Sequence, residues 1–90
     1  MGKFLYILQS EKTGRYYVGS TDNPKRRLIE HNSGQTKSTR SGKPWKKVYS
    51  HEFATSQLGI KVERKIKSLK SRRVIGEIIS GKIDLEALLW

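Results

Sequence analysis

Residues 4–19 read FLYILQSEKTGRYYVG, and this stretch decides how the fold begins. Phe4–Leu8 and Tyr16–Gly19 are rich in the aromatic and branched residues that favour β-strands. Ser10–Gly14 between them is polar and ends in a glycine, which suits a turn. The chain is therefore predicted to start with an antiparallel β-hairpin.

The hairpin brings two tyrosines onto one face of the sheet. If Tyr6 pairs directly opposite Tyr17, their β-carbons lie about 5 Å apart on the same face. Gly19 falls on that face by alternation, and a glycine that ends a strand lets a ligand or another part of the chain approach closely. Ordinary strand packing would equally explain the two tyrosines.

A first helix is predicted to begin at Pro24, with Asn23 as its N-cap. It would end at residues 32–34, where Asn-Ser-Gly tolerates the left-handed terminating conformation. Arg27 and His31 are four residues apart and share one side of this helix. Arg27 could hold a phosphate through two parallel hydrogen bonds, and His31 could orient water or give a proton to a leaving oxygen. The structural alternative is a solvated helix face rich in arginine.

The middle of the chain contains a basic segment and a third strand. Gln35–Pro44 is polar, and we expect it to form a mobile basic loop. Trp45–Phe53 is predicted to be a strand. Its large aromatic residues recur at even spacing, as on one face of a strand: Trp45, Tyr49 and Phe53.

Two further helices are predicted. Thr55 or Ser56 can cap the first of them, and its apolar residues form a buried stripe: Leu58, Val62, Ile66 and Leu69. Ser71 can cap the second, with these residues facing inward: Val74, Ile75, Ile78 and Ile79. Gly81 would lie past its end, and the tail 82–90 would form a short helix capped by Asp84.

These elements predict an α+β fold, a small three-stranded antiparallel sheet flanked by helices in the order β-β-α-β-α-α. The 90 residues suffice for one domain, 1–90, with a core at about 3–80 and an apolar tail at 82–90. No apolar stretch reaches the length of a membrane span, so we expect a cytoplasmic protein without membrane contact.

Charge is the most informative property of the composition. The chain has 19 Lys and Arg against 8 Asp and Glu, a net charge of +11, which predicts a polyanionic partner. A solvated basic surface is the alternative. The absence of cysteine excludes a disulfide framework, a thiolate zinc site and a cysteine nucleophile.

Glu63 is the one acid in the basic run from Lys61 to Arg73. It could form a salt bridge with Lys67, one helical turn later. It could also hold Mg²⁺, because a single carboxylate completed by water and substrate phosphates is a normal way to bind this ion.

As a set, these residues resemble the GIY-YIG nuclease superfamily. The motifs that carry the resemblance are Phe4-Leu5-Tyr6, Tyr17-Val18-Gly19, Arg27, His31-Asn32 and Glu63. The resemblance covers about Lys3 to Ile79 and is greatest to the small stand-alone bacterial type, related to excision-repair and Slx1-type nuclease domains. The chain departs from the family motifs at three packing positions, where Phe4, Leu5 and Val18 replace Gly, Ile and Ile.

The resemblance implies a metal-dependent endonuclease that hydrolyses DNA phosphodiester bonds. Glu63 would hold one Mg²⁺ or Mn²⁺ ion, and Tyr6 would be the general base. Tyr17 would position water or the phosphate, Arg27 would stabilise the developing negative charge, and His31 would assist Tyr6.

Further residues are expected to contact nucleic acid: Gly19, Ser20, Asn32, Lys37, Arg40, Lys43, Trp45, Lys46 and Lys47. Trp45 could stack on an unpaired base, although packing within the strand is its other expected role. The sequence contains no recognition helix or zinc module. We therefore expect selectivity for DNA structure rather than sequence, in DNA repair or processing.

Two other classes of function stay open on sequence alone. The same scaffold could be a non-catalytic DNA- or RNA-binding module, which would bind without metal-dependent cleavage. The apolar tail could also make the chain a peripheral membrane or partner-docking protein, which would prefer anionic liposomes to DNA.

Overall fold

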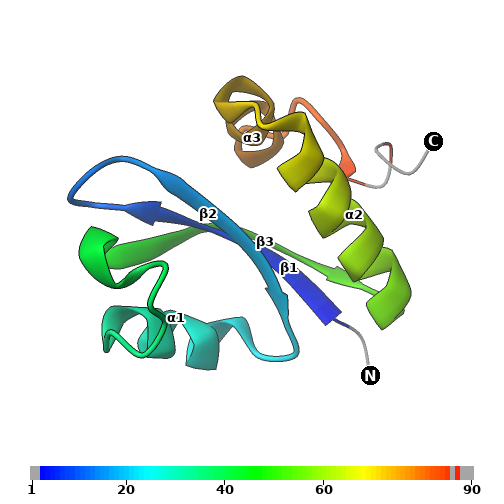
Figure 1. Ribbon diagram of the computed structural model, residues 1–90. Coiled ribbons are helices and arrows are strands. Elements are labelled where there is room, and N and C mark those ends of the chain that lie inside the picture. Colours follow the sequence, from blue (N-terminus) through cyan, green and yellow to red (C-terminus); the bar gives the residue numbers. More distant parts are fainter. Residues whose placement is uncertain (1–2, 86, 88–90) are drawn as a thin grey trace.

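A three-stranded antiparallel sheet with helices on both faces forms the body of the molecule (Figure 1). A computed structural model describes residues 3–85 and 87. The strand order is β2-β1-β3, so β1 is central and β2 is an edge strand. In Figure 1, α1 lies on one side of the sheet and α2 and α3 lie on the other. The elements are β1 (Lys3–Ser10), β2 (Tyr16–Thr21), α1 (Pro24–Asn32), the 3₁₀-helix η1 (Arg40–Gly42), β3 (Trp45–Phe53), α2 (Ser56–Leu69) and α3 (Arg72–Ile79). The predicted α+β class and element order are confirmed.

Strand β1 is buried on both faces, which explains its uninterrupted apolar sequence. Its odd positions join the core under α2 and α3, whose buried members are Leu5, Ile7, Val18, Phe53, Val62, Ile66, Ile78 and Leu85. Its even positions join a smaller cluster on the α1 side, made by Tyr6, Leu8 and Trp45 with Tyr17 and Leu28 packed against them. The sheet thus separates a large apolar core from an aromatic face.

The hairpin register differs from the predicted one. Tyr6 pairs with Gly19, and Tyr17 pairs with Leu8, so the direct pairing of the two tyrosines is wrong. The turn is longer than expected because Ser10 organises it. Its amide donates to Arg15 O at 2.9 Å, and its hydroxyl accepts from the amides of Lys12 and Thr13. The register shift is two residues, so the tyrosines still share one face.

A β-bulge in β3 redirects its aromatic side chains. Ile7 pairs with Tyr49 but Leu8 pairs with Lys47, which leaves Val48 as an extra residue. As a consequence Trp45 faces the α1 side, whereas Tyr49 packs against the core on the α2 side. The even spacing of Trp45, Tyr49 and Phe53 therefore does not place all three on one face.

Helix α1 and the segment that follows it pack as one unit against the aromatic face. The Asn23 side chain accepts from the Arg26 amide, which confirms the predicted cap. Residues 35–44, expected to form a mobile loop, are instead packed: they contain η1 and bury Thr39 to 1% exposure. Two buried hydrogen bonds, from Ser10 Oγ to Gly42 O and from Trp45 Nε1 to Thr39 O, hold this segment in place.

Helices α2 and α3 begin at the predicted caps. Thr55 accepts from the Leu58 amide and Ser71 from the Val74 amide. Leu69 differs from its prediction, because it is 41% exposed at the last residue of α2.

The described part of the tail packs on the core. Leu85 is fully buried, and the Ala87 amide donates to Asp84 O at 3.0 Å. The rest of the predicted tail helix, Glu86 and 88–90, lies outside the described residues. Within residues 3–85 and 87, no helix is both long and apolar enough to cross a membrane.

Candidate active site

The aromatic face brings the two predicted tyrosines together over a glycine. The rings of Tyr6 and Tyr17 lie 6.2 Å apart between centroids. A β-carbon placed on Gly19 would lie 2.6 Å from the Tyr6 hydroxyl oxygen, so only glycine leaves room for this phenol. The close approach expected at Gly19 is therefore made by Tyr6 itself. Because Gly19 is buried, it offers no open surface to a nucleic acid.

His31 connects Tyr6 to the packed segment before β3. The imidazole is fully buried, with Nε2 3.0 Å from the Tyr6 hydroxyl and Nδ1 2.7 Å from Thr39 Oγ1. Thr39 Oγ1 in turn donates to Thr36 O at 3.3 Å. With that hydroxyl proton used, Nδ1 carries the imidazole proton and Nε2 accepts from Tyr6. Thr39 is a site residue that sequence reasoning missed, since nothing in a polar loop indicates which residue will meet His31.

Arg27 reaches the same phenol from the preceding turn of α1. Its guanidinium donates to Glu30 at 2.7 Å and also interacts with the Tyr6 phenol, whose pKa it lowers. Both partners raise the pKa of Arg27, so the side chain is a permanent cation. Glu30 was not predicted as part of the site, although its spacing of three residues from Arg27 is a usual signal for a helical ion pair.

Burial sets the protonation states of the phenol and the imidazole. It raises the pKa of Tyr6 above its ordinary value of 10.0, and the hydrogen bond from Arg27 opposes this effect. Burial, together with the nearby Arg27 charge, lowers the pKa of His31. At neutral pH the resting site therefore holds a neutral phenol hydrogen-bonded to a neutral imidazole.

Glu63 approaches this site from α2, across the edge strand β2. Its Oε1 accepts from the hydroxyl of Ser20, the residue next to Gly19, and its Oε2 accepts from Lys67 at 2.8 Å. The Lys67 ammonium also lies 5.9 Å from the centre of the Tyr17 ring. The negative charge of Glu63 contributes to raising the pKa of Tyr6, so the two side chains interact electrostatically.

A divalent metal ion bound at this site would have a single carboxylate ligand from the protein, Glu63. Among the described residues, no three His, Asp or Glu side chains form a group that could hold a metal ion. Glu63 fits the alternative of a single protein carboxylate, because its side chain is 19% exposed and its ion-pair partner Lys67 is 52% exposed. The Ser20 hydroxyl would orient the carboxylate from the other side.

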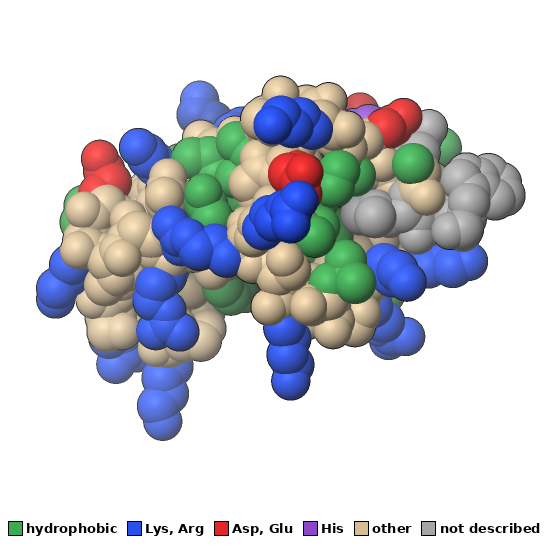
Figure 2. All heavy atoms as spheres, turned by 90° about the horizontal axis from the view of Figure 1, so that it is seen from above, with side chains coloured by type: hydrophobic (Ala, Val, Ile, Leu, Met, Phe, Trp, Pro, Cys, Tyr) green, Lys and Arg blue, Asp and Glu red, His purple; other side chains and the backbone are tan. Residues whose placement is uncertain are grey.

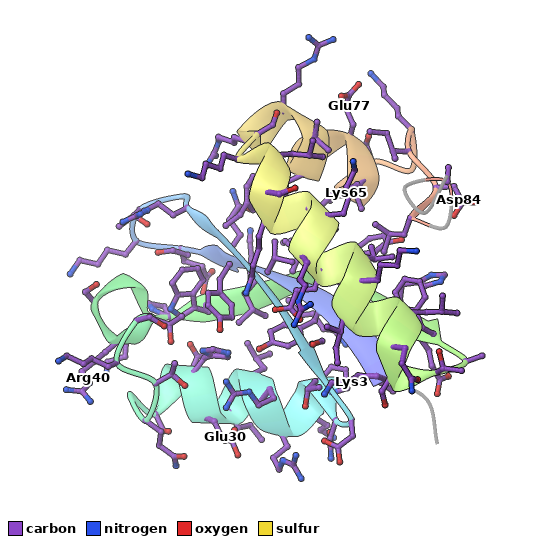
Figure 3. All side chains as sticks on the ribbon, turned by 45° about the vertical axis from the view of Figure 1, so that its right-hand side comes forward. Lys3, Glu30, Arg40, Lys65, Glu77 and Asp84 are labelled. Carbon is purple, nitrogen blue, oxygen red and sulfur yellow. The ribbon has the colours of Figure 1, made fainter. Side chains whose placement is uncertain are left out.

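Two of the expected nucleic-acid contacts are structural instead. The Asn32 amide donates to Trp45 O at 2.9 Å and accepts from Trp45 N at 2.6 Å, so it anchors the start of β3. Trp45 is 7% exposed and its indole donates to Thr39 O at 2.7 Å, so it cannot stack on a base. The five basic candidates are exposed: Lys37, Arg40, Lys43, Lys46 and Lys47. Figure 3 shows Arg40 projecting from the packed segment away from the body of the molecule.

Sequence comparison defines the class of this domain. Residues 2–75 match the GIY-YIG catalytic domain, and the chain belongs to this family of nucleases, whose members generally depend on divalent metal ions. Within it, the chain is 37% identical over 88 residues to a UPF0213 protein of Streptococcus pneumoniae, covering 97% of this chain and 87% of that one.

A solved structure and a eukaryotic relative extend the comparison. The solution structure of a UPF0213 protein from Bacillus halodurans matches with a TM-score of 0.59 and 32% identity, covering 91% of this chain and 86% of that chain. The structure-specific endonuclease subunit SLX1 of Meyerozyma guilliermondii is 37% identical over 77 residues. The alignment covers 77% of this chain but only 26% of SLX1.

Proposed function

We propose that this protein is a divalent-metal-dependent endonuclease that hydrolyses DNA phosphodiester bonds and selects its substrate by structure. One observation carries the proposal: Tyr6, Tyr17, Arg27 and His31 meet on one face, and Glu63 reaches their edge across β2. These groups come from four different elements, β1, β2, α1 and α2.

The hydrogen-bond chain supports Tyr6 as the general base. The Tyr6 proton is directed at His31 Nε2, so the phenol can give up this proton as it takes one from an attacking water. Thr39 accepts from Nδ1 and stabilises the imidazolium that forms. Arg27, beside the same phenol oxygen, favours the phenolate and would stabilise negative charge on the phosphate.

Glu63 supports the metal requirement. Mg²⁺ or Mn²⁺ held there would neutralise charge at the scissile phosphate and at the leaving oxygen. Tyr17, whose ring centroid lies 6.2 Å from that of Tyr6 and 5.9 Å from the Lys67 ammonium, would position the phosphate. The exposed lysines around β3 would hold the flanking backbone without reading sequence.

The relative SLX1 is a structure-specific endonuclease subunit, which supports selectivity for DNA structure in this chain. Flap, branched and overhang substrates are the expected targets, in DNA repair or processing in the cytoplasm. The whole chain would act as a single domain.

Metal-dependent cleavage tests the proposal. Purified protein should nick flap or branched DNA with Mg²⁺ or Mn²⁺ and not with EDTA. Glu63→Gln and Arg27→Ala should each lower the cleavage rate by at least about 100-fold, while the Kd for the same DNA changes by less than about tenfold. Lys61→Gln, on the outer side of α2, is the matched control and should cleave normally. Equal losses of binding and cleavage in the two site variants would refute the assigned roles.

A second function, a non-catalytic nucleic-acid binder, is favoured by two specific observations. Tyr6 is 1% exposed, and both Glu63 oxygens already have partners within the protein. If the protein shifts DNA or RNA on a gel but shows no cleavage with either metal on duplex, flap, branched or single-stranded DNA, this second function replaces the first.

A further inference from the structure

A groove of about 390 Å³ lies beside the candidate site, where the edge strand β2 faces α2 and α3. Its floor is apolar and includes Val18, Ile66 and Ile75, while its rim carries Arg15, Lys70 and Arg72. None of the residues that line it is acidic. Figure 2, which views the molecule from the α2 and α3 side, shows apolar side chains exposed between Lys and Arg side chains.

One cation of the rim, Arg72, is held in position by two contacts. Arg72 donates to Gly14 O at 2.8 Å, and its guanidinium lies 4.6 Å from the centre of the Tyr16 ring. Lys70 ends α2 in the left-handed conformation with φ of 48°, where glycine is the usual residue. A lysine in this conformation is strained, and its side chain lies at the rim of the groove.

We propose that this groove binds an unpaired nucleotide of a nucleic-acid strand. An apolar floor with a cationic rim complements an aromatic base joined to a phosphate. In a duplex, both faces of a base are covered by its stacked neighbours, so only an unpaired base can contact such a floor. An acidic peptide could form ion pairs with the cations of the rim, but its carboxylate side chains offer no aromatic ring to cover the apolar floor.

Tyr17 connects this groove to the candidate site. It lines the groove, and its ring also lies 4.8 Å from His31 and 6.2 Å from Tyr6. A nucleotide in the groove would therefore place its phosphate next to the cleavage site. The inference rests on the proposed function in two respects: that the polyanion is a nucleic acid, and that the bound phosphate lies next to a cleavage site. Binding of the nucleotide itself requires neither metal nor cleavage.

The first test measures binding in EDTA by fluorescence anisotropy. Three probes of equal length are compared: single-stranded oligothymidine, an abasic strand with the same phosphates, and a blunt duplex. The base contact predicts that oligothymidine binds at least about fivefold more tightly than the abasic strand. A polyglutamate peptide at equal charge should not displace it. Equal affinities for the two strands, or displacement by polyglutamate, would overturn the proposal.

The second test removes one rim cation without harming the fold. Lys70→Gly relieves a left-handed lysine, so the variant should be no less stable than the wild-type protein. Its affinity for oligothymidine should fall about fivefold at 0.1 M salt, as expected for one lost phosphate contact to a single strand. Lys61→Gln, which also removes one positive charge from α2, should leave this affinity within about twofold, and an equal loss in both variants would refute the groove as the site.

These outcomes separate the inference from the proposed function. If the protein cleaves DNA but binds oligothymidine and the abasic strand equally, the nucleotide-binding groove is refuted and the nuclease function stands. If the protein never cleaves DNA, but its binding of a single strand depends on the bases and on Lys70, the nuclease function is refuted and the nucleotide-binding groove stands.

Discussion

Gly19→Ala tests directly whether stability and cleavage depend on the close approach of Tyr6 to β2. The added β-carbon would lie 2.6 Å from the Tyr6 hydroxyl oxygen and 2.7 Å from the ring carbon that bears it. Non-bonded carbons prefer about 3.5–4.0 Å, so the ring must move by about 1 Å. Tyr6 is 1% exposed and hydrogen-bonded to His31, so it cannot move without disturbing its neighbours. Overpacking of this kind lowers the free energy of unfolding by about 1–3 kcal/mol.

The same displacement should impair cleavage. Misplacing a reacting group by about 1 Å costs about 100-fold in rate, so the cleavage rate should fall at 20 °C, where the variant is still folded. Thermal unfolding should show a decrease in Tm of about 4–8 °C for each kcal/mol lost. Stability is measured by urea and thermal unfolding, and activity on the flap substrate with Mg²⁺.

Gly76→Ala is the matched control, because no heavy atom lies within 4 Å of its added β-carbon. This residue lies inside α3, where alanine should stabilise the helix by about 0.5–1 kcal/mol. The two identical substitutions should therefore shift stability in opposite directions. If Gly19→Ala is as stable and as active as the wild-type protein, the packing of Tyr6 over β2 is not what positions the phenol.

Three further predictions follow from the site. Because the pKa of His31 is lowered in the folded protein, the unfolded chain binds the proton more readily. The free energy of unfolding should therefore fall below about pH 6.5, by at most about 1.4 kcal/mol per pH unit, and His31→Gln should remove this part of the pH dependence of urea unfolding. Asn32→Ala removes both hydrogen bonds to the Trp45 backbone and should cost about 1–3 kcal/mol by the same measurement; a change below about 0.5 kcal/mol would show that the anchor is dispensable. Lys47→Gln should reduce the slope of log K against log salt for duplex DNA by about 0.9, and an unchanged slope would place Lys47 away from the phosphates.

The helix boundaries were predictable because their signals are local. Asn23, Thr55 and Ser71 each accept from an amide three residues later, and such a contact depends only on the neighbouring sequence. The shared face of Arg27 and His31 follows in the same way from helical periodicity.

The strand pairing was less predictable, because register depends on contacts between segments. The turn organised by Ser10 is longer than predicted, so Tyr6 pairs with Gly19 rather than with Tyr17. The bulge at Val48 turned Trp45 toward α1, where its ring is buried and unavailable for stacking. A period of two in the sequence cannot reveal an inserted residue.

By itself, the sequence determined the element order, the helix caps, the basic charge and the set of candidate site residues, because these depend on residue type and short-range spacing. Only the tertiary structure decided that Thr39 holds His31, that Asn32 anchors β3, and that Glu63 reaches the tyrosine site across β2. Ser20 and Glu63, 43 positions apart in the sequence, meet there because the hydrophobic effect packs α2 against the sheet. The apolar stripe of α2 predicts a buried face, but it does not reveal which segment will cover that face.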